Sequence, residues 1–350
     1  MSQQINPPLV DLFGEPIPAG ASESTRVSRR SAAAEKNPRL APVPQSTAAI
    51  ETAKKLPAAI RLGTSSWSFP GWEGLVYNGL FSETKLARDG LPAYAAHPLM
   101  KTVSIDRTFY APISESDFAH YASQVPNSFR FVVKAPMAVT SSYVRSETGE
   151  FADSPYFLNA DYAIDEFIAP AAAGLGNTVG PLVFQFPPQG KRVTANPDPF
   201  INQLYRFLSK LPPGLVYAVE VRDAQLLTNR FFKCLDTTSS RFCVASHAKM
   251  PTPAAQIALM NKEMPVGDFV CRWSLHAGFR YEDAKSRYFP FNKLVDEDYA
   301  SRAALATAAA SAARQGYASF VTINNKAEGS APLSVERLAE AIVLHLDTGT

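Results

Sequence analysis

Short apolar runs recur along the chain, and several of them end in a polar or charged residue. Six such runs are Val103-Ser104-Ile105-Asp106, Phe131-Val132-Val133-Lys134, Leu182-Val183-Phe184-Gln185, Ala218-Val219-Glu220-Val221-Arg222, Phe269-Val270-Cys271-Arg272 and Phe320-Val321-Thr322-Ile323-Asn324-Asn325. Helix-like segments separate most of these runs. Strands that alternate with helices predict a parallel sheet.

The whole pattern predicts eight strands within residues 58–350. They are expected near residues 60–66, 101–106, 129–134, 181–186, 216–222, 241–246, 268–273 and 318–324. Eight strand-helix units in a segment of this length indicate an α/β fold of the closed (β/α)₈ TIM-barrel type. In such a barrel, polar residues at the carboxyl ends of the strands converge on one mouth, where active sites lie.

Helices are predicted between the strands from apolar stripes and capping residues. They are expected over 84–96, from Ser114 to Val125, over 198–211, over 296–315, and in a last helix that Ser334 caps. Regular structure is not evident over 247–267 and 274–295, which we interpret as loops at the mouth or as spacers.

Side chains alternate between the two faces of a strand, which divides the predicted strands into two sets. The first set becomes polar toward the strand end: Ser104/Asp106, Val132/Lys134, Val183/Gln185, Ala218/Glu220/Arg222, Val270/Arg272 and Thr322/Asn324. The second set is apolar: Val103/Ile105, Phe131/Val133, Phe184/Phe186, Val219/Val221, Phe269/Cys271 and Val321/Ile323. We expect the first set to face the barrel interior and the second to face the helices.

Residues 1–57 are rich in Pro, Ala and Ser, and Phe13 is their only aromatic residue. Such a segment buries too little apolar surface to offset the entropy of ordering, so we predict a disordered extension. Asp11-Leu12-Phe13 resembles the end of the peptide with which bacterial proteins bind the sliding clamp of replication, with Leu9 in place of the expected Gln. The clamp is therefore one candidate partner, and a small apolar tether is the alternative.

Composition restricts the class of protein. The formal charge of +2 over 350 residues argues against a broad basic surface for duplex DNA, so a nucleic-acid partner is not favoured. Three cysteines without CxxC spacing, Cys234, Cys243 and Cys271, are typical of reduced thiols in a cytoplasmic protein. No apolar stretch is long enough to span a bilayer and no signal peptide is evident, so we expect no membrane partner.

Motifs spread over residues 60–345 carry a resemblance to a known family. They are Arg61-Leu62-Gly63-Thr64-Ser65-Ser66-Trp67, Thr108-Phe109-Tyr110, Phe131-Val132-Val133-Lys134-Ala135-Pro136, Gly180-Pro181-Leu182-Val183-Phe184-Gln185-Phe186-Pro187-Pro188, Tyr217-Ala218-Val219-Glu220-Val221-Arg222, residues 270–276 and Asn324-Asn325-Lys326. The chain resembles the YecE-like family (domain of unknown function 72), which implies a TIM barrel and no established reaction. Two motifs differ: the usual Glu-x-Asn-Ser before Thr108 is here Ser104, Asp106 and Arg107, and the usual R-x-H-G reads Arg272-Trp273-Ser274-Leu275-His276.

Charged residues at the predicted mouth are candidates for acid–base catalysis and for binding an anion. Glu220 and Asp106 are a candidate acid–base pair, because an enclosed site can raise the pKa of one carboxyl group while the other stays ionised. The alternative is a network of salt bridges. Lys134, Arg222 and Arg272 are candidates for holding an anion, or they only neutralise the two acids. The five residues leave one positive charge, which favours an anionic ligand.

Histidines and amides add further candidates. His276 follows a predicted strand and is a candidate proton shuttle, as is His247, although loop histidines are more often surface residues. These two with Glu220 and Asp106 supply potential metal ligands, but their spacing matches no compact metal motif. We therefore assign no metal, and the sequence identifies no cofactor.

Other polar and aromatic residues at the mouth are candidates for ligand contacts. Gln185, Asn324 and Asn325 offer hydrogen bonds, and for the two asparagines a turn is the alternative. Trp67 and Tyr110 are candidates for stacking on a sugar or base, or they plug the end of the barrel.

The sequence thus predicts an enzyme-like barrel that binds a phosphate- or carboxylate-bearing ligand, with acid–base hydrolysis as the candidate reaction. Two alternatives stay open: a nucleic-acid processing or repair protein, and a ligand sensor without catalysis. Signatures of P-loop nucleotide binding, dinucleotide binding and serine hydrolysis are absent from the sequence.

Overall fold

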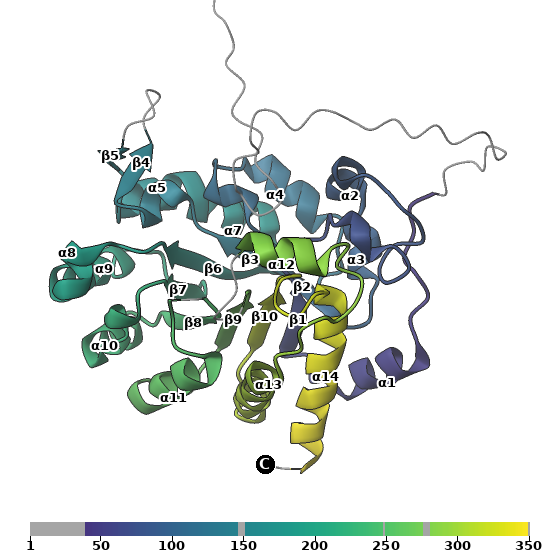
Figure 1. The fold of residues 1–350 in the computed structure, drawn as a ribbon. Coiled ribbons are helices and arrows are strands. Elements are labelled where there is room, and N and C mark those ends of the chain that lie inside the picture. Colours follow the sequence, from purple (N-terminus) through teal and green to yellow (C-terminus); the bar gives the residue numbers. More distant parts are fainter. Residues whose placement is uncertain (1–38, 146–150, 248, 276–280, 349–350) are drawn as a thin grey trace, which may run out of the picture. The chain divides into compact units, whose positions relative to one another are not determined.

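The apolar runs of the sequence form strands that close into a barrel. The computed structural model of the chain describes residues 39–145, 151–247, 249–275 and 281–348, and Leu40–Thr350 form one unit (Figure 1). The barrel strands are β1 (Ile60–Thr64), β2 (Met100–Ile105), β3 (Arg130–Lys134), β6 (Val179–Phe186), β7 (Tyr217–Val221), β8 (Arg241–Ala245), β9 (Phe269–Trp273) and β10 (Ser319–Ile323). Each coincides with a predicted run, and the ends differ by at most two residues.

The ring is continuous and parallel. The strands follow the order β1, β10, β9, β8, β7, β6, β3 and β2, and β2 pairs with β1 to close the barrel. Since the strands run in the same direction, their carboxyl ends share one mouth. The register places Gln185 beside Glu220 and Thr322 beside Arg272, so polar residues of neighbouring strands lie at similar depths.

Helices surround this barrel (Figure 1). They are α1 (Thr47–Lys55), α2 (Glu83–Asp89), α3 (Leu91–Ala95), α4 (Glu115–Ala122), α5 (Met137–Thr140), α6 (Ala160–Ala163), α7 (Ala169–Leu175), α8 (Lys191–Ala195), α9 (Asp198–Leu208), α10 (Asn229–Thr237), α11 (Pro253–Glu263), α12 (Tyr281–Tyr288), α13 (Tyr299–Arg314) and α14 (Ala331–Thr348). A separate antiparallel pair, β4 (Tyr143–Arg145) and β5 (Phe151–Asp153), lies outside the barrel. Within the described residues, no helix has both the length and the hydrophobicity needed to cross a membrane.

Several helix boundaries differ from the prediction for local reasons. The helix expected over 84–96 divides at Gly90 into α2 and α3, and Pro92 lies in the first turn of α3, where its missing N–H does no harm. Ser334 lies buried inside α14 instead of capping it, because the helix begins at Ala331. The backbone N–H of Ala331 donates instead to Asn325 Oδ1 at 2.9 Å.

The two segments that lacked an evident pattern contain α11 and α12. In α11, Thr252 Oγ1 accepts a hydrogen bond from the backbone N–H of Ala255, and Pro253 occupies the first helical position. A Thr-Pro pair is a local signal for the start of a helix, so the start of α11 could have been predicted from the sequence.

The boundary predicted near residue 57 is wrong for the segment just before it. Ser46 caps α1 by accepting a hydrogen bond from Ala49 N at 3.1 Å, and α1 packs against α14. Packing on the barrel thus orders a segment whose own composition favours disorder. The segment of the clamp-like motif, Leu9, Asp11, Leu12 and Phe13, lies outside the described residues.

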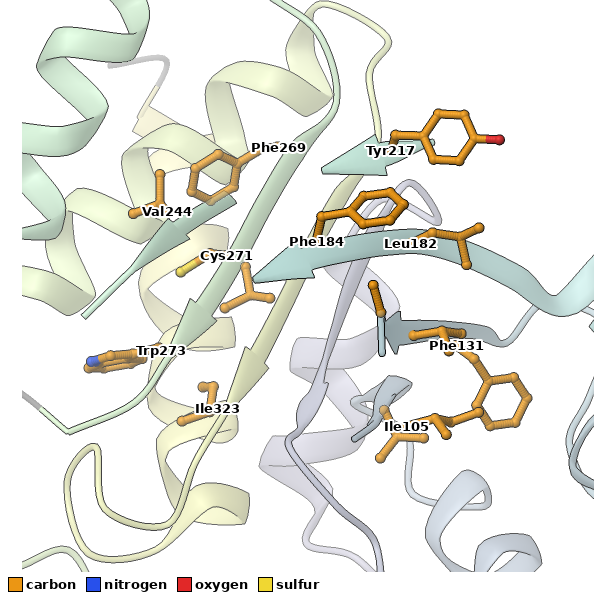
Figure 2. Packing of buried hydrophobic residues seen from close by; sticks show 14 of the residues in the cluster. Ile105, Phe131, Leu182, Phe184, Tyr217, Val244, Phe269, Cys271, Trp273 and Ile323 are labelled. Carbon is orange, nitrogen blue, oxygen red and sulfur yellow. The ribbon is translucent and has the colours of Figure 1, made fainter. Parts of the chain in front are cut away.

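The apolar side chains of the barrel strands divide between two clusters, as the alternation of side chains predicted. Inside the barrel, a small cluster is formed by Val132, Val183, Ala218, Cys243, Val270 and Phe320. The apolar set from the opposite strand faces belongs to the larger cluster that packs against the helices, and Figure 2 labels Ile105, Phe131, Phe184, Phe269 and Ile323 among its members. Apolar side chains from alanine to phenylalanine therefore fill the barrel, and the polar ends of the same strand faces are left at the mouth.

Candidate functional site

Arg272 joins polar side chains from several strands at the carboxyl-terminal mouth. It is the last but one residue of β9, and its Nη1 donates to Gln185 Oε1 and to Glu220 Oε2, each at 3.0 Å. Its Nη2 donates to Asp106 Oδ2 at 2.6 Å. These four residues lie at or just after the carboxyl ends of four different strands. Barrel closure therefore brings them together, as the sequence predicted.

Glu220 is fully buried within this network. Arg222 Nε donates to its Oε1 at 2.7 Å, while Arg272 binds its Oε2. Burial by itself raises the pKa of Glu220, but Arg222, Arg272 and Lys134 outweigh it and hold that pKa below its ordinary value. Glu220 therefore stays ionised and orients two guanidinium groups, so the expected role in proton transfer does not fit its surroundings.

Asp106 is the more accessible of the two acids. Its side chain is 31% exposed and accepts hydrogen bonds from Arg272 and, through Oδ1, from Ser104 Oγ at 2.5 Å. Ser104 belongs to the same interior strand face two residues earlier. Asp106 thus connects the buried network to the open side of the mouth, which is where a proton-transferring group must lie.

Lys134 differs from the two arginines in the surroundings of its amine. Within the described part of the chain, no carboxylate oxygen lies within 4.0 Å of Nζ. The side chain is only 8% exposed, and Nζ lies over the ring of Phe109, 3.5 Å from its centroid. Burial lowers the pKa of Lys134 to about 8; the acids Asp106 and Glu220 oppose this shift, and Arg272 and Arg222 add to it.

Phe109 and Thr108 are site residues that were not predicted individually. Thr108 Oγ1 donates to the backbone oxygens of Ile105 and Lys134, which ties the turn after β2 to the end of β3. This turn presents the Phe109 ring to Lys134, and Tyr110 packs edge-on against Phe109 while remaining 45% exposed. The signal was present, because Thr108-Phe109-Tyr110 directly follows a strand.

Other predicted ligand contacts have structural roles instead. Trp67 is 7% exposed, packs edge-on against Tyr121 and donates through Nε1 to Ala87 O at 3.3 Å, so it is a packing residue. Asn325 Oδ1 accepts from Trp72 Nε1 at 3.0 Å and from the start of α14.

Asn324 also takes part in a turn. Its Nδ2 donates to Ser65 Oγ at 3.1 Å and its Oδ1 accepts from Lys326 N at 2.9 Å. The turn alternative thus fits both asparagines better than ligand binding.

The histidines contribute less to the mouth than the charged residues do. His247 is half-buried, and burial, followed by the nearby Arg222, lowers its pKa to about 4, so its ring is neutral near pH 7. His276 lies outside the described residues. Among the residues that the structure describes, no three His, Cys, Asp or Glu side chains are grouped so that they could hold a metal ion.

A separate cavity with a volume of about 550 Å³ lies between α11 and the start of α13. His247, Asp296 and Glu297 are among its lining residues. Asp296 is paired with Arg287 and Glu297 with Arg302, each at 2.8 Å. The acidic lining makes this cavity a poor place for an anion, so the mouth network is the better candidate.

Comparisons with known proteins agree with this architecture. A family model described as "Protein of unknown function DUF72" matches residues 61–348. The crystal structure of a DUF72 family protein from Enterococcus faecalis is 19% identical, matches over 81% of this chain and 95% of its own, and has a TM-score of 0.55. For a DUF72 family protein from Thermotoga maritima, the identity is 18%, the coverage 80% and 98%, and the TM-score 0.52. No curated protein matches this chain, and likeness at this level of identity shows the fold alone.

Proposed function

This chain belongs to the DUF72 family, as its motifs predicted, and we propose that it binds a small phosphate- or carboxylate-bearing ligand at the mouth of its barrel. The observation that carries this proposal is the charge balance of the network. Among the described residues, the carboxylates that interact with Lys134 and Arg272 are two, those of Asp106 and Glu220, and Arg222 pairs with Glu220 as well. At pH 7 one positive charge is left over in a poorly solvated site, and an anion is the natural partner for it.

The cations have different tasks in this proposal. Both terminal nitrogens of Arg272 are already engaged with acceptors of the protein. Arg222 uses Nε and Nη2 on Glu220, and within the described residues its Nη1 makes no hydrogen bond. Lys134 Nζ and Arg222 Nη1 therefore contact the ligand, whereas Arg272 positions the acids around it.

Hydrolysis of the bound ligand is the reaction that we propose for this site. Asp106 is the proton-transferring group, because it is the acid with access to the mouth, and Glu220 keeps its negative charge throughout. The cations stabilise charge that develops on the ligand in the transition state. Hydrolysis that continues unchanged in an Asp106→Asn variant would contradict this role.

The binding proposal is tested by calorimetric titration with inorganic phosphate. We expect Lys134→Met and Arg222→Gln each to weaken binding by at least about tenfold, because each removes a ligand-facing cation. Lys101→Met is the matched control, since Lys101 is half-buried at the other end of a barrel strand. Equal phosphate affinity in all four proteins would contradict the proposed site.

A further inference from the structure

Lys134 combines three properties that distinguish it from the other cations at the mouth. It ends β3, so its amine points to the region where the strand ends converge. The side chain is nine-tenths buried, yet within the described residues no carboxylate forms an ion pair with its amine. Its amine rests on the face of Phe109, which excludes water from one side.

These surroundings change what the amine can do. An exposed lysine is almost entirely protonated at pH 7 and has no lone pair to offer. With a pKa of about 8, roughly a tenth of the Lys134 amines are neutral at that pH. Burial together with neighbouring guanidinium groups is a known way to activate a lysine as a nucleophile.

The charged groups around the amine come from every side of the network. Asp106 follows β2, Glu220 and Arg222 are at the end of β7, and Arg272 is on β9. The acids favour the ammonium form and the arginines favour the neutral form. Since both arginines are held by Glu220, the positive charge beside Lys134 is fixed in place.

We propose that Lys134 is a nucleophilic amine that forms an imine with an aldehyde or ketone group of the anionic ligand. This inference rests on the proposed function for recognition of the anion and adds the chemical class of the ligand, a carbonyl compound that carries a phosphate or carboxylate. Arg222 Nη1 holds the anionic group, and the carbonyl carbon lies next to Lys134 Nζ.

The reaction needs no additional oxidant or reductant. The lone pair of Nζ forms a bond to the carbonyl carbon, and the carbonyl oxygen takes up a proton as the nitrogen loses one, which gives a carbinolamine. The nitrogen then loses its second proton, the hydroxyl group leaves as water, and a C=N bond forms. Asp106 carries the proton between the nitrogen and the departing oxygen. Addition of water reverses the sequence and releases the ligand.

The test uses the full chain with pyridoxal 5′-phosphate, an aldehyde that carries a phosphate, followed by reduction with sodium borohydride and peptide mass spectrometry. We expect the reduced adduct on Lys134 to form at least about tenfold faster at pH 7 than on any other lysine, because few other amines are neutral there. The rate at Lys134 should rise with pH and level off above a midpoint near 8.

Two variants separate nucleophilicity from charge. Lys134→Arg keeps a cation but no reactive amine, so it should lose the adduct and still bind inorganic phosphate. Lys101→Met should retain the Lys134 adduct, since Lys101 lies near the start of β2. Labelling at Lys134 no faster than at surface lysines would overturn the imine proposal.

The same experiment distinguishes this inference from the proposed function. If phosphate binds and Arg222→Gln weakens it, but Lys134 stays unlabelled, the imine proposal fails and anion binding stands. If pyridoxal without the phosphate labels Lys134 as fast, and inorganic phosphate does not slow the reaction, anion binding fails and the nucleophilic amine stands.

Discussion

At the scale of single residues, the mouth depends on Arg272 and Glu220. Arg272 contacts side chains that follow or end three other strands, and Glu220 holds both arginines while being fully buried. A buried carboxylate between two guanidinium groups is stable only while all partners are present, because each charge compensates the desolvation of the others.

Replacing Glu220 by Gln is therefore expected to destabilise the protein by about 3 kcal/mol, since two guanidinium groups lose their shared counter-charge. Urea unfolding at pH 7 measures this change. Glu340→Gln is the control, because the surface pair of Glu340 with Arg337 is exposed and should contribute under about 1 kcal/mol. Similar unfolding midpoints for the two variants would show that the network does not stabilise the fold.

Acidification tests the same residue by protonating its carboxylate, which removes the negative charge without a substitution. The pKa of Glu220 is lower in the folded chain than its ordinary value of 4.5, so its contribution to stability is present above that pH. The contribution is lost as the pH falls through the folded pKa. The free energy of unfolding of Glu220→Gln should accordingly fall less below pH 4.5 than that of the wild type.

At the scale of elements, strands were easier to predict than helix boundaries. Each strand of this barrel was predicted from its own apolar run and polar end, without knowledge of the strands that pair with it. Helix ends depended on single side chains instead of on a repeating pattern: at the start of α14, the backbone N–H of Ala331 donates to Asn325, and Pro92 lies in the first turn of α3. Periodicity does not reveal such contacts.

The contact between β1 and β2 gives a prediction at this scale. A Cβ atom on Gly63 would lie 1.8 Å from the backbone oxygen of Thr102, which belongs to the neighbouring strand β2. We expect Gly63→Ala to lower the free energy of unfolding by about 3 kcal/mol or to prevent folding. Chemical denaturation measures this change in the free energy of unfolding.

Gly316→Ala provides the comparison. Gly316 has a φ of +82° but open space around it, so alanine there is strained without a clash and should cost about 1 kcal/mol. If Gly63→Ala were the milder of the two, the close approach of β1 and β2 would be refuted.

At the scale of the whole molecule, the folded unit extends farther toward the amino terminus than composition indicates. Ala41 N donates to Asn78 Oδ1 at 2.9 Å, Val43 N donates to Val76 O at 3.1 Å, and α1 packs against α14. Val76, whose backbone oxygen accepts from Val43, is 1% exposed.

A chain that starts at residue 58 should therefore be less stable than one that starts at residue 39, by about 2 kcal/mol or more, because apolar surface under residues 40–57 becomes exposed. Thermal and urea unfolding of the two truncated proteins measure the difference. Equal stability would mean that this segment only lies on the barrel without supporting it.

Much of the candidate site was also predictable. Asp106, Lys134, Gln185, Glu220 and Arg222 were expected at one mouth with Arg272, and the structure brings them there because strand alternation and barrel closure leave no other place for them. Their individual roles were not predictable, since a role depends on which donors and acceptors meet within about 3 Å.

The barrel, the two faces of each strand and the gathering of charges at one end could be inferred from the amino-acid pattern alone, because they follow from a periodicity of two and from the direction of parallel strands. The pairing of Glu220 with two arginines became evident only from the folded arrangement, as did the position of Lys134 over Phe109, where none of the described carboxylates lies within 4.0 Å of its amine. That difference arises from distances and burial among residues far apart in the chain, and no local pattern encodes them.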